Sequence, residues 1–275
     1  MKTVVLITGA SSGIGKCAAE YLIKKGFVVY GAARSTDKME GLVQLGGNAI
    51  YMDVTSGEST AEGINSILKK EGRIDCLINN AGYGLYGSVE EVSIEDAKKQ
   101  MDVNLFGLAR LTQLVLPIMR EQKSGRIINI SSIAGKITSP MGAWYFASKH
   151  AVEGFSDSLR QEVKPFGIDV VIIEPGGVKS EWSSIGRSYL MERSQGGPYE
   201  DLATKIAGYF PFVDEENSDP VIIAELIYKA ITAKRPKTRY IGGARALELL
   251  IAKKLLSDRL FDDAVLSQIK QRRKE

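Results

Sequence analysis

The first apolar stretch of the chain leads without a break into a glycine-rich turn. Residues 3–8 (TVVLIT) are typical of a strand that is buried on both faces of a parallel sheet. The turn at 9–15 (GASSGIG) is followed by apolar residues at helical spacing. Such a turn directs free N–H groups and the positive end of the helix dipole towards one point. The order of the three segments predicts a phosphate-binding site; a tight connection without a ligand is the alternative.

Two phosphate-binding motifs can be compared with this turn. The Walker motif does not fit, because Ala10 stands at its first glycine and Cys17 at the Ser or Thr that binds magnesium. The spacing Gly13-x-Gly15-x-x-Ala18 is a loose match to the dinucleotide-binding fingerprint. We therefore expect a dinucleotide at this turn.

Strand-like and helix-like segments alternate after the turn. Strands are expected at 27–32, 49–52, 74–79, 125–130, just before Pro175 and at 238–241, and a long helical region at about 91–121. Strands separated by helices of this length form right-handed βαβ units and a parallel sheet. We predict a Rossmann-type, doubly wound α/β fold with a mainly parallel seven-stranded sheet, in which residues 1–275 form a single domain.

The residues after the second predicted strand bear on the identity of the dinucleotide. A NAD-binding protein places an acidic residue there to bind the ribose 2′-hydroxyl, whereas this chain has Arg34. An arginine suits a 2′-phosphate, which it can bind with charge-assisted hydrogen bonds. This favours NADP(H) over NAD(H), although Asp37 leaves NAD(H) open.

Polar residues follow two further strands at the same edge of the predicted sheet. Asn79-Asn80-Ala81-Gly82 end the fourth strand, and Ser131-Ser132 end the fifth. Ligands of open α/β sheets bind at this edge. Asn104 interrupts an apolar helical stripe, and a buried asparagine must be hydrogen-bonded.

Tyr145 and Lys149 are four residues apart in a predicted helix, so they share one face. A free tyrosine ionises near pH ~10, and a nearby ammonium favours its phenolate form. The pair is a candidate acid/base. The same spacing is also common on solvated helices.

Together these residues resemble the short-chain dehydrogenase/reductase family. The matching motifs, in the family's order from residue 3 to about 180, are Thr8-Gly-x-x-x-Gly-x-Gly15, Asp53, Asn79-Asn80-Ala81-Gly82, Asn104, Ser132, Tyr145-x-x-x-Lys149 and Pro175-Gly176. Ser180 is a small departure, where the family often has threonine, and it keeps the hydroxyl.

The resemblance implies hydride transfer between a nicotinamide and a carbonyl or secondary alcohol. It implies that Tyr145 is the acid/base, that Ser132 orients the carbonyl, and that Asn104 supports a water-linked proton path. Lys149 would bind the ribose and lower the pKa of Tyr145. The implied cofactor-binding residues are Gly9, Ser11, Ser12, Gly13, Ile14, Gly15, Arg34, Asp53, Val54, Asn80, Ala81, Gly82, Tyr145, Lys149, Pro175, Gly176 and Val178.

The substrate side is predicted less sharply. Scattered apolar residues without clear periodicity at about 177–215 suggest a lid with short helices. They favour an apolar substrate, such as a steroid, retinoid or lipid, although they could simply pack the lid onto the domain. The C-terminal extension, about 244–275, forms predicted helices that end in basic residues. We favour a role in covering the core or lid; a subunit contact and a membrane-surface contact remain alternatives.

Composition excludes several classes of function. A net charge of +3 gives no indication of nucleic-acid binding. Cys17, Cys76 and the single His150 do not supply a metal site, and free thiols suit a reducing compartment. With no leader and no apolar run of ~18 residues, we expect a cytoplasmic protein. By resemblance we expect a homodimer or homotetramer.

Three rival functions remain open. One is a NAD-dependent dehydrogenase of the same family. Another is a nucleotide-sensing regulator, which would not require Ser132, Tyr145 and Lys149. The third is an epimerase or dehydratase of nucleotide sugars, although such enzymes usually have a larger C-terminal substrate domain.

Overall fold

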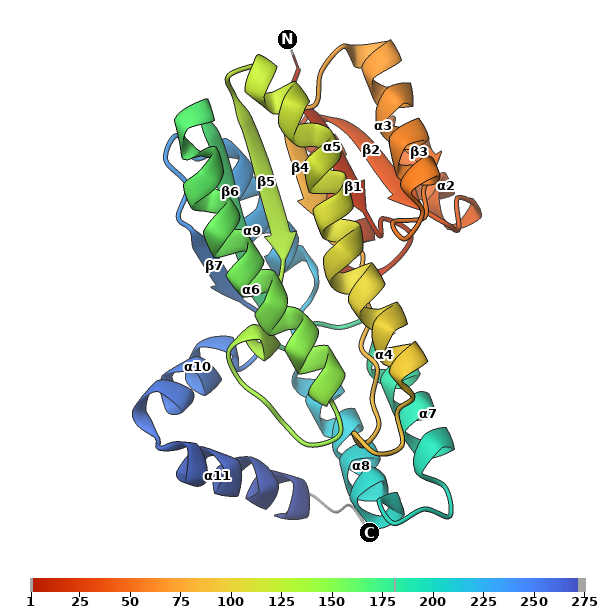
Figure 1. The fold of residues 1–275 in the computed structure, drawn as a ribbon, viewed down its shortest axis with the longest axis vertical. Coiled ribbons are helices and arrows are strands. Elements are labelled where there is room, and N and C mark those ends of the chain that lie inside the picture. The colour runs from red at the N-terminus through yellow and green to blue at the C-terminus, as the bar shows by residue number, and fades with distance from the viewer. Residues whose placement is uncertain (1, 181, 272–275) are drawn as a thin grey trace.

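The computed structural model describes residues 2–180 and 182–271. Seven parallel strands form one sheet in the order β3-β2-β1-β4-β5-β6-β7 (Figure 1). The strands are β1 (Val4–Thr8), β2 (Val28–Ala33), β3 (Asn48–Tyr51), β4 (Cys76–Asn79), β5 (Gly125–Ile130), β6 (Ile168–Pro175) and β7 (Arg239–Gly242). The predicted Rossmann-type α/β fold with seven strands is confirmed, and every strand pairing is parallel.

Helices cover both faces of this sheet and continue below its carboxyl edge. The helices are α1 (Gly13–Lys24), α2 (Glu40–Gln44), α3 (Gly57–Glu71), α4 (Ile94–Met101), α5 (Leu108–Glu121), α6 (Ala143–Val163), α7 (Trp182–Ser194), α8 (Glu200–Glu216), α9 (Val221–Thr232), α10 (Ala246–Leu255) and α11 (Asp258–Gln271). Shorter helical turns span Asp37–Met39, Ile133–Gly135 and Lys164–Phe166.

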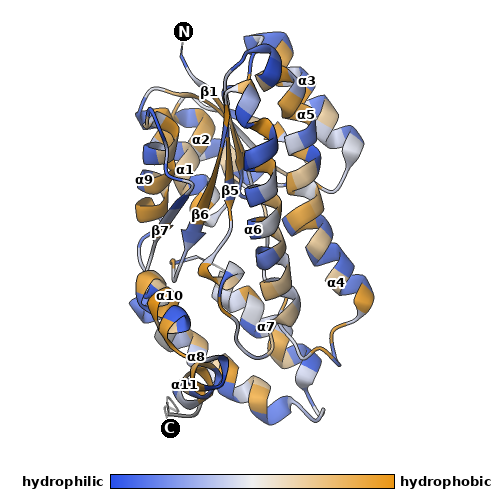
Figure 2. Ribbon diagram, turned by 60° about the vertical axis from the view of Figure 1, so that its left-hand side comes forward, coloured by the Kyte–Doolittle hydropathy of each residue, from blue (hydrophilic) through white to orange (hydrophobic). Residues whose placement is uncertain are grey.

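The two-residue period of the strands divides the core into two layers. In β1, Val5 and Ile7 pack with α1 and α9, whereas Val4 and Leu6 pack with α3, α5 and α6. All four side chains are almost completely buried. Because both faces are covered, the central strands are apolar throughout, while the helices carry polar outer faces (Figure 2). The carboxyl ends of the strands therefore form the edge that is free to hold a ligand.

The long helical region predicted at about 91–121 is present, but its start and its internal geometry differ from a regular α-helix. It begins at Ile94, because the side chain of Ser93 accepts a hydrogen bond from the N–H of Asp96 and so caps α4. It is also interrupted between α4 and α5 by a π-helical turn, Asp102–Gly107. Such turns add a residue to the helical repeat and often lie at functional sites. Here the turn contains Asn104.

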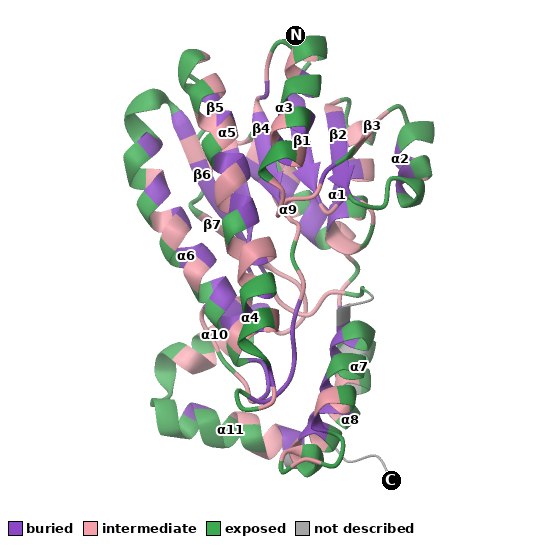
Figure 3. Cartoon of the chain, turned by 45° about the vertical axis from the view of Figure 1, so that its right-hand side comes forward, coloured by how far each residue is buried: buried purple, intermediate pink, exposed green. Residues whose placement is uncertain are grey.

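Two helical units lie below the carboxyl edge of the sheet (Figure 1). The predicted lid consists of α7 and α8, which are longer than the short helices expected for this region. The C-terminal extension consists of α10 and α11, and Ile269 of α11 packs in one cluster with Leu190 of α7 and Ile206 of α8. Both units keep exposed outer faces (Figure 3). The predicted basic run at 270–274 lies mostly outside the described residues.

Within residues 2–180 and 182–271, no helix combines the length and the apolar character that are needed to cross a bilayer.

Candidate active site

A cleft of about 1150 Å³ lies at the carboxyl edge of the sheet, between the strand ends and the helices α7, α8, α10 and α11. It is lined by every predicted cofactor-binding residue except Gly15, and by Ser132. Segments that are far apart in the sequence therefore meet in one place. Asn104 lies behind the wall of the cleft and is buried.

The glycine turn is compact because the backbone at Gly15 passes close to the backbone at Gly9, and we call this close approach the crossing. Gly9 has a φ of +67°, and a Cβ atom at Gly15 would lie 2.3 Å from the carbonyl oxygen of Gly9. Asn80 Nδ2 donates hydrogen bonds to the carbonyl oxygens of Thr8, at 2.9 Å, and Gly9, at 3.3 Å. A side chain at either glycine would fill this crossing.

The N-terminus of α1 faces the cleft with its backbone donors available. Among the described residues, the Ser12 side chain makes no capping hydrogen bond, so the first N–H groups of the helix are not satisfied locally. Gly13 lines the cleft with a φ of +52°. The donors and the helix dipole fit the phosphates of a dinucleotide.

Thr8 has a structural role that was not predicted from the sequence. Its Oγ1 accepts hydrogen bonds from the backbone N–H groups of Asn80 and Ala81, both at 3.0 Å. This joins the ends of β1 and β4 at the floor of the cleft. The available signal was its position as a hydroxyl residue at the end of an apolar strand.

Asn104 joins three segments around the site. Its Oδ1 accepts from the N–H of Tyr83, and its Nδ2 donates to the carbonyl of Tyr83 and to Oγ of Ser148, all at 3.0 Å. These hydrogen bonds connect the loop after β4 to α6. A Cβ atom at Gly82 would lie 3.2 Å from Asn104 Oδ1 and 3.8 Å from Lys149 Nζ. Ser148 was not predicted as part of the site.

Ser132 and Tyr145 are hydrogen-bonded to each other through their side chains. Ser132 Oγ also donates to the carbonyl of Pro175, at 3.2 Å, and accepts from the N–H of Ala134, at 3.1 Å. Burial raises the pKa of Tyr145 to about 12, and the bond with Ser132 opposes this rise. At neutral pH the phenol is therefore protonated and can donate.

Lys149 is buried beside this pair, but its ammonium points to the backbone. Nζ donates a 2.9 Å hydrogen bond to the carbonyl oxygen of Ile130. Burial lowers the pKa of Lys149 to about 8, and the charge of Glu153 opposes this fall. The expectation that Lys149 holds the pKa of Tyr145 below its usual value does not match this arrangement, in which burial of the phenol dominates.

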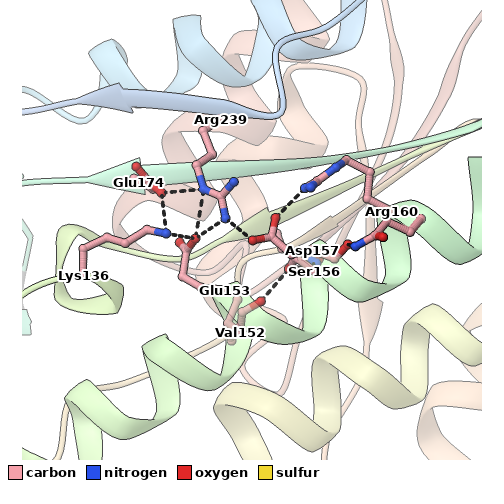
Figure 4. Close-up of polar contacts among 10 residues, drawn as sticks. Lys136, Val152, Glu153, Ser156, Asp157, Arg160, Glu174 and Arg239 are labelled. Atoms are coloured by element: carbon pink, nitrogen blue, oxygen red, sulfur yellow. Dashed lines mark hydrogen bonds and ion pairs between the residues drawn. The ribbon is translucent and has the colours of Figure 1, made fainter.

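A charge cluster with two buried carboxylates includes Glu153, one helical turn after Lys149 on α6, and Figure 4 shows its ion pairs. At its centre, the guanidinium of Arg239 in β7 contacts Glu153 at 2.9 Å, Glu174 at 3.0 Å and Asp157 at 2.7 Å. Lys136 adds a second cation, with Nζ 3.1 Å from Glu153. Glu153 and Glu174 are almost completely buried.

The charge cluster connects the segments that carry the catalytic candidates. Lys136 follows the turn after Ser132, Glu153 is one helical turn after Lys149, and Glu174 precedes Pro175. Burial raises the pKa of Glu174 to about 7, and the neighbouring carboxylate of Glu153 acts in the same direction. None of these charged residues was predicted to belong to the site.

Arg34 and Asp53 lie at the end of the cleft expected for the adenosine. Arg34 is exposed and lines the cleft. Burial alone would raise the pKa of Asp53, but hydrogen bonds from Thr55 and the charges of Arg34 and Arg110 lower it. Asp53 Oδ1 accepts from the N–H and the hydroxyl of Thr55, at 2.9 and 2.7 Å. The guanidinium of Arg34 is thus available to an anion.

The opposite end of the cleft is aromatic. The rings of Tyr86 and Tyr145 have centroids 6.3 Å apart, and Tyr86 makes an edge contact with Phe210 at 5.4 Å. Arg193 of α7 forms an ion pair with Asp96 of α4, at 2.9 Å. Aromatic rings therefore lead from the candidate acid, Tyr145, to α8.

Within residues 2–180 and 182–271, no group of three or more His, Cys, Asp or Glu side chains is arranged to hold a metal ion.

Comparison with known proteins extends these observations. A family model described as short chain dehydrogenase matches residues 3–187. The 3-ketodihydrosphingosine reductase of Bacteroides thetaiotaomicron is 36% identical over 253 residues, covering 91% of each chain. The NADPH-dependent 3-dehydrocapnine reductase of Ornithobacterium rhinotracheale is 34% identical over 284 residues, covering 97% of each. A short-chain dehydrogenase structure from Streptomyces avermitilis is 32% identical with a TM-score of 0.78, covering 98% of this chain and 96% of that one.

Proposed function

The chain belongs to the short-chain dehydrogenase/reductase family, and from this premise we propose that it is an NADP(H)-dependent oxidoreductase. Its substrate would be a ketone or secondary alcohol with an apolar, lipid-like body. The observation that carries the proposal is the hydrogen bond between Ser132 and Tyr145 beside buried Lys149, in a cleft that also contains the glycine turn.

The cofactor proposal is supported by the shape and charge of one end of the cleft. Gly9, Gly13 and Gly15 allow the backbone to approach a pyrophosphate, and the N-terminus of α1 supplies donors to it. Arg34 would bind the 2′-phosphate of NADP(H). Lys149 would donate to the ribose from its position beside Gly82, where a Cβ atom would lie 3.8 Å from Nζ. The bound nicotinamide would supply or accept the hydride.

The protein's own part of the reaction is to bind the carbonyl and supply a proton. Tyr145 is protonated at neutral pH, because burial raises its pKa to about 12. Its hydroxyl would donate a proton to the carbonyl oxygen as negative charge develops there. Ser132 would donate a hydrogen bond to the same oxygen and stabilise that charge. Asn104 would keep the loop after β4 against α6, so that the spacing of these groups is maintained.

A lipid-like substrate is supported by the lid end of the cleft. Tyr86, Phe146, Ile206 and Phe210 line it. The names of two relatives specify reduction of 3-ketodihydrosphingosine and of 3-dehydrocapnine. Removing an apolar chain from water contributes about 25 cal/mol per Å² buried, so a long chain would contribute substantially to affinity.

Cofactor oxidation followed at 340 nm tests the proposal directly. A panel of ketones, aldehydes and alcohols should be offered with NADPH or NADH for reduction and with NADP⁺ or NAD⁺ for oxidation. We expect turnover with NADPH on ketones, increasing with the length of the apolar chain. A chain that bound NADPH tightly but turned over no member of the panel would instead act as a nucleotide sensor.

A further inference from the structure

The cations that line the cleft fall into two groups. Arg193 and Lys99 belong to the first group, because both are ion-paired with Asp96, at 2.9 and 3.1 Å. The second group has no ion pair in the described part of the chain, and its members are Arg34, Lys149 and Arg245. The proposed function assigns the first two of these to the cofactor. Arg245 remains without an assigned partner.

Arg245 is held by neutral groups on two helices. Its guanidinium donates to the hydroxyl of Tyr209 in α8, at 3.2 Å, and to Oε1 of Gln268 in α11, at 3.3 Å. The Tyr209 hydroxyl also donates to Gln268 Oε1, at 3.3 Å. All three residues line the cleft. These partners orient the guanidinium but leave its charge uncompensated, so it remains available to an anion.

The backbone fixes Arg245 relative to the sheet. Arg245 has a φ of +56°, a left-handed conformation that costs energy in a non-glycine residue, and it precedes the first turn of α10. The neighbouring residue, Ala244, exchanges two backbone hydrogen bonds with Gly177, at 3.0 and 2.9 Å. Gly177 directly follows the Pro175–Gly176 segment. Strained, anchored residues of this kind are concentrated at ligand sites.

Apart from its polar partners, the helices next to Arg245 contribute apolar side chains to the cleft. Leu249 of α10, Val265 and Ile269 of α11, and Phe210 of α8 line the same part of the cleft. A ligand here would therefore meet one cation and several apolar side chains, while Glu216 and Asn217 also line the cleft. A molecule with both an acidic group and an apolar body complements this arrangement.

We propose that Arg245, with Tyr209 and Gln268, forms a subsite for the acidic group of an amphiphilic ketone substrate. The inference rests on the proposed function, because it names the substrate class of the same cleft. The acidic group is a sulfonate, phosphate or carboxylate, since a guanidinium binds all three with paired N–H donors. The hydroxyl of Tyr209 can rotate to donate to the same anion.

Binding of two fluorescent probes tests the subsite without requiring turnover. Anilinonaphthalene sulfonate is an apolar sulfonate, and N-phenylnaphthylamine has the same rings without the acid. Arg245→Gln should weaken binding of the sulfonate roughly ten- to a hundredfold and leave the neutral probe within about threefold, as expected for loss of a charge-assisted bond. Lys253→Gln is the matched control, because Lys253 lies on α10, the helix that follows Arg245, and pairs with Asp258 outside the cleft.

A second experiment compares the turnover of matched substrates. Medium-chain ketones bearing a sulfonate, phosphonate or carboxylate are compared with the neutral ketone of equal length. Wild type should prefer the acidic members in kcat/KM, and the most favoured acid identifies the source of the anion. Arg245→Gln should remove that preference, and Arg245→Lys should restore part of it.

Three outcomes would overturn the subsite. One is an equal loss on acidic and neutral ligands, which indicates a structural role. Another is weaker NADPH binding with unchanged probe binding, which places Arg245 in the cofactor site. The third is failure of wild type to distinguish the two probes. Turnover of neutral ketones is independent of all three, so the proposed function stands or fails separately.

Discussion

Arg239 Nε lies 3.0 Å from Oε1 of Glu174, the residue immediately before Pro175. The pair joins β7 to the end of β6, directly under the cleft. Because the same guanidinium also contacts Glu153 of α6, one side chain holds together two of the segments on which the proposed catalytic residues depend. A buried cluster of this kind is costly unless all its members are paired.

Glu174 should make stability depend on pH. Burial raises its folded-state pKa from an ordinary 4.5 to about 7, so between these values the folded state binds more protons than the unfolded state. The free energy of unfolding should therefore fall as pH rises through this window. In urea titrations, Glu174→Gln should reduce the decrease in unfolding free energy across this pH window by roughly 1–3 kcal/mol. Exposed Glu248→Gln is the control, and an equal slope in Glu174→Gln and wild type would contradict the prediction.

Lys149 should make NADPH binding weaken in alkaline solution. Its pKa is lowered to about 8 by burial, so its ammonium is lost as pH rises through that value. Titration by NADPH fluorescence should show Kd rising roughly tenfold above this pH. Lys136→Met should move the midpoint to higher pH, because it leaves the carboxylate of Glu153 less compensated and so favours the Lys149 ammonium. A midpoint that moved down, or moved equally in Lys253→Met, would refute this coupling.

Tyr145→Phe removes the proposed proton donor and keeps the ring. We expect kcat on the best ketone to fall roughly 10²–10⁴-fold, with Kd for NADPH within about threefold. Tyr30→Phe is the control, because the hydroxyl of Tyr30 bonds to Glu71, away from the cleft. Full turnover by Tyr145→Phe would exclude the mechanism.

Arg34→Ala should reverse the cofactor preference. Loss of the guanidinium should raise Kd for NADPH roughly ten- to a hundredfold and leave Kd for NADH nearly unchanged. Lys38→Ala removes an exposed cation four positions further along and should change neither value. A preference for NADH in the wild-type protein would show that Arg34 does not bind a 2′-phosphate.

Gly15→Ala tests the crossing of the glycine turn. The added methyl carbon would lie 2.3 Å from the carbonyl oxygen of Gly9, so the backbone must move apart. We expect a loss of at least about 2 kcal/mol of unfolding free energy and a loss of NADPH binding. Gly154→Ala on α6 is the control, because a Cβ atom there would have no neighbour within 4 Å. This variant should raise the unfolding free energy by up to ~1 kcal/mol. Similar effects of the two variants would argue against a tight crossing.

Most of the fold could be predicted because periodicity is a local property of the sequence. The apolar runs at 3–8 and 125–130 and the helices between them required no knowledge of long-range contacts. The π-helical turn at Asp102–Gly107 could not be predicted, since one added residue leaves the apolar spacing on either side intact. The lengths of α7 and α8 were also missed, because each packs against segments distant in the sequence and shows little periodicity of its own.

The candidate site was predictable to the extent that it follows from motifs at strand ends. Parallel strands bring their carboxyl ends to one edge, so the glycine turn, Asn80, Ser132 and Tyr145 meet there. The charge cluster was not predictable. Arg239 reaches Glu174 and Glu153 across 65 and 86 positions, and their contact depends on the register of β6 with β7.

The order of the cleft's two walls along the chain has a practical consequence. The wall proposed to bind the cofactor comes from residues 9–178, whereas much of the wall facing the substrate comes from α7–α8 and α10–α11. These two helical pairs are separated in the sequence by α9 and β7, but they pack against each other through Ile269, Leu190 and Ile206. Grafting both pairs together from a relative should therefore alter which molecules are accepted without rebuilding the redox chemistry.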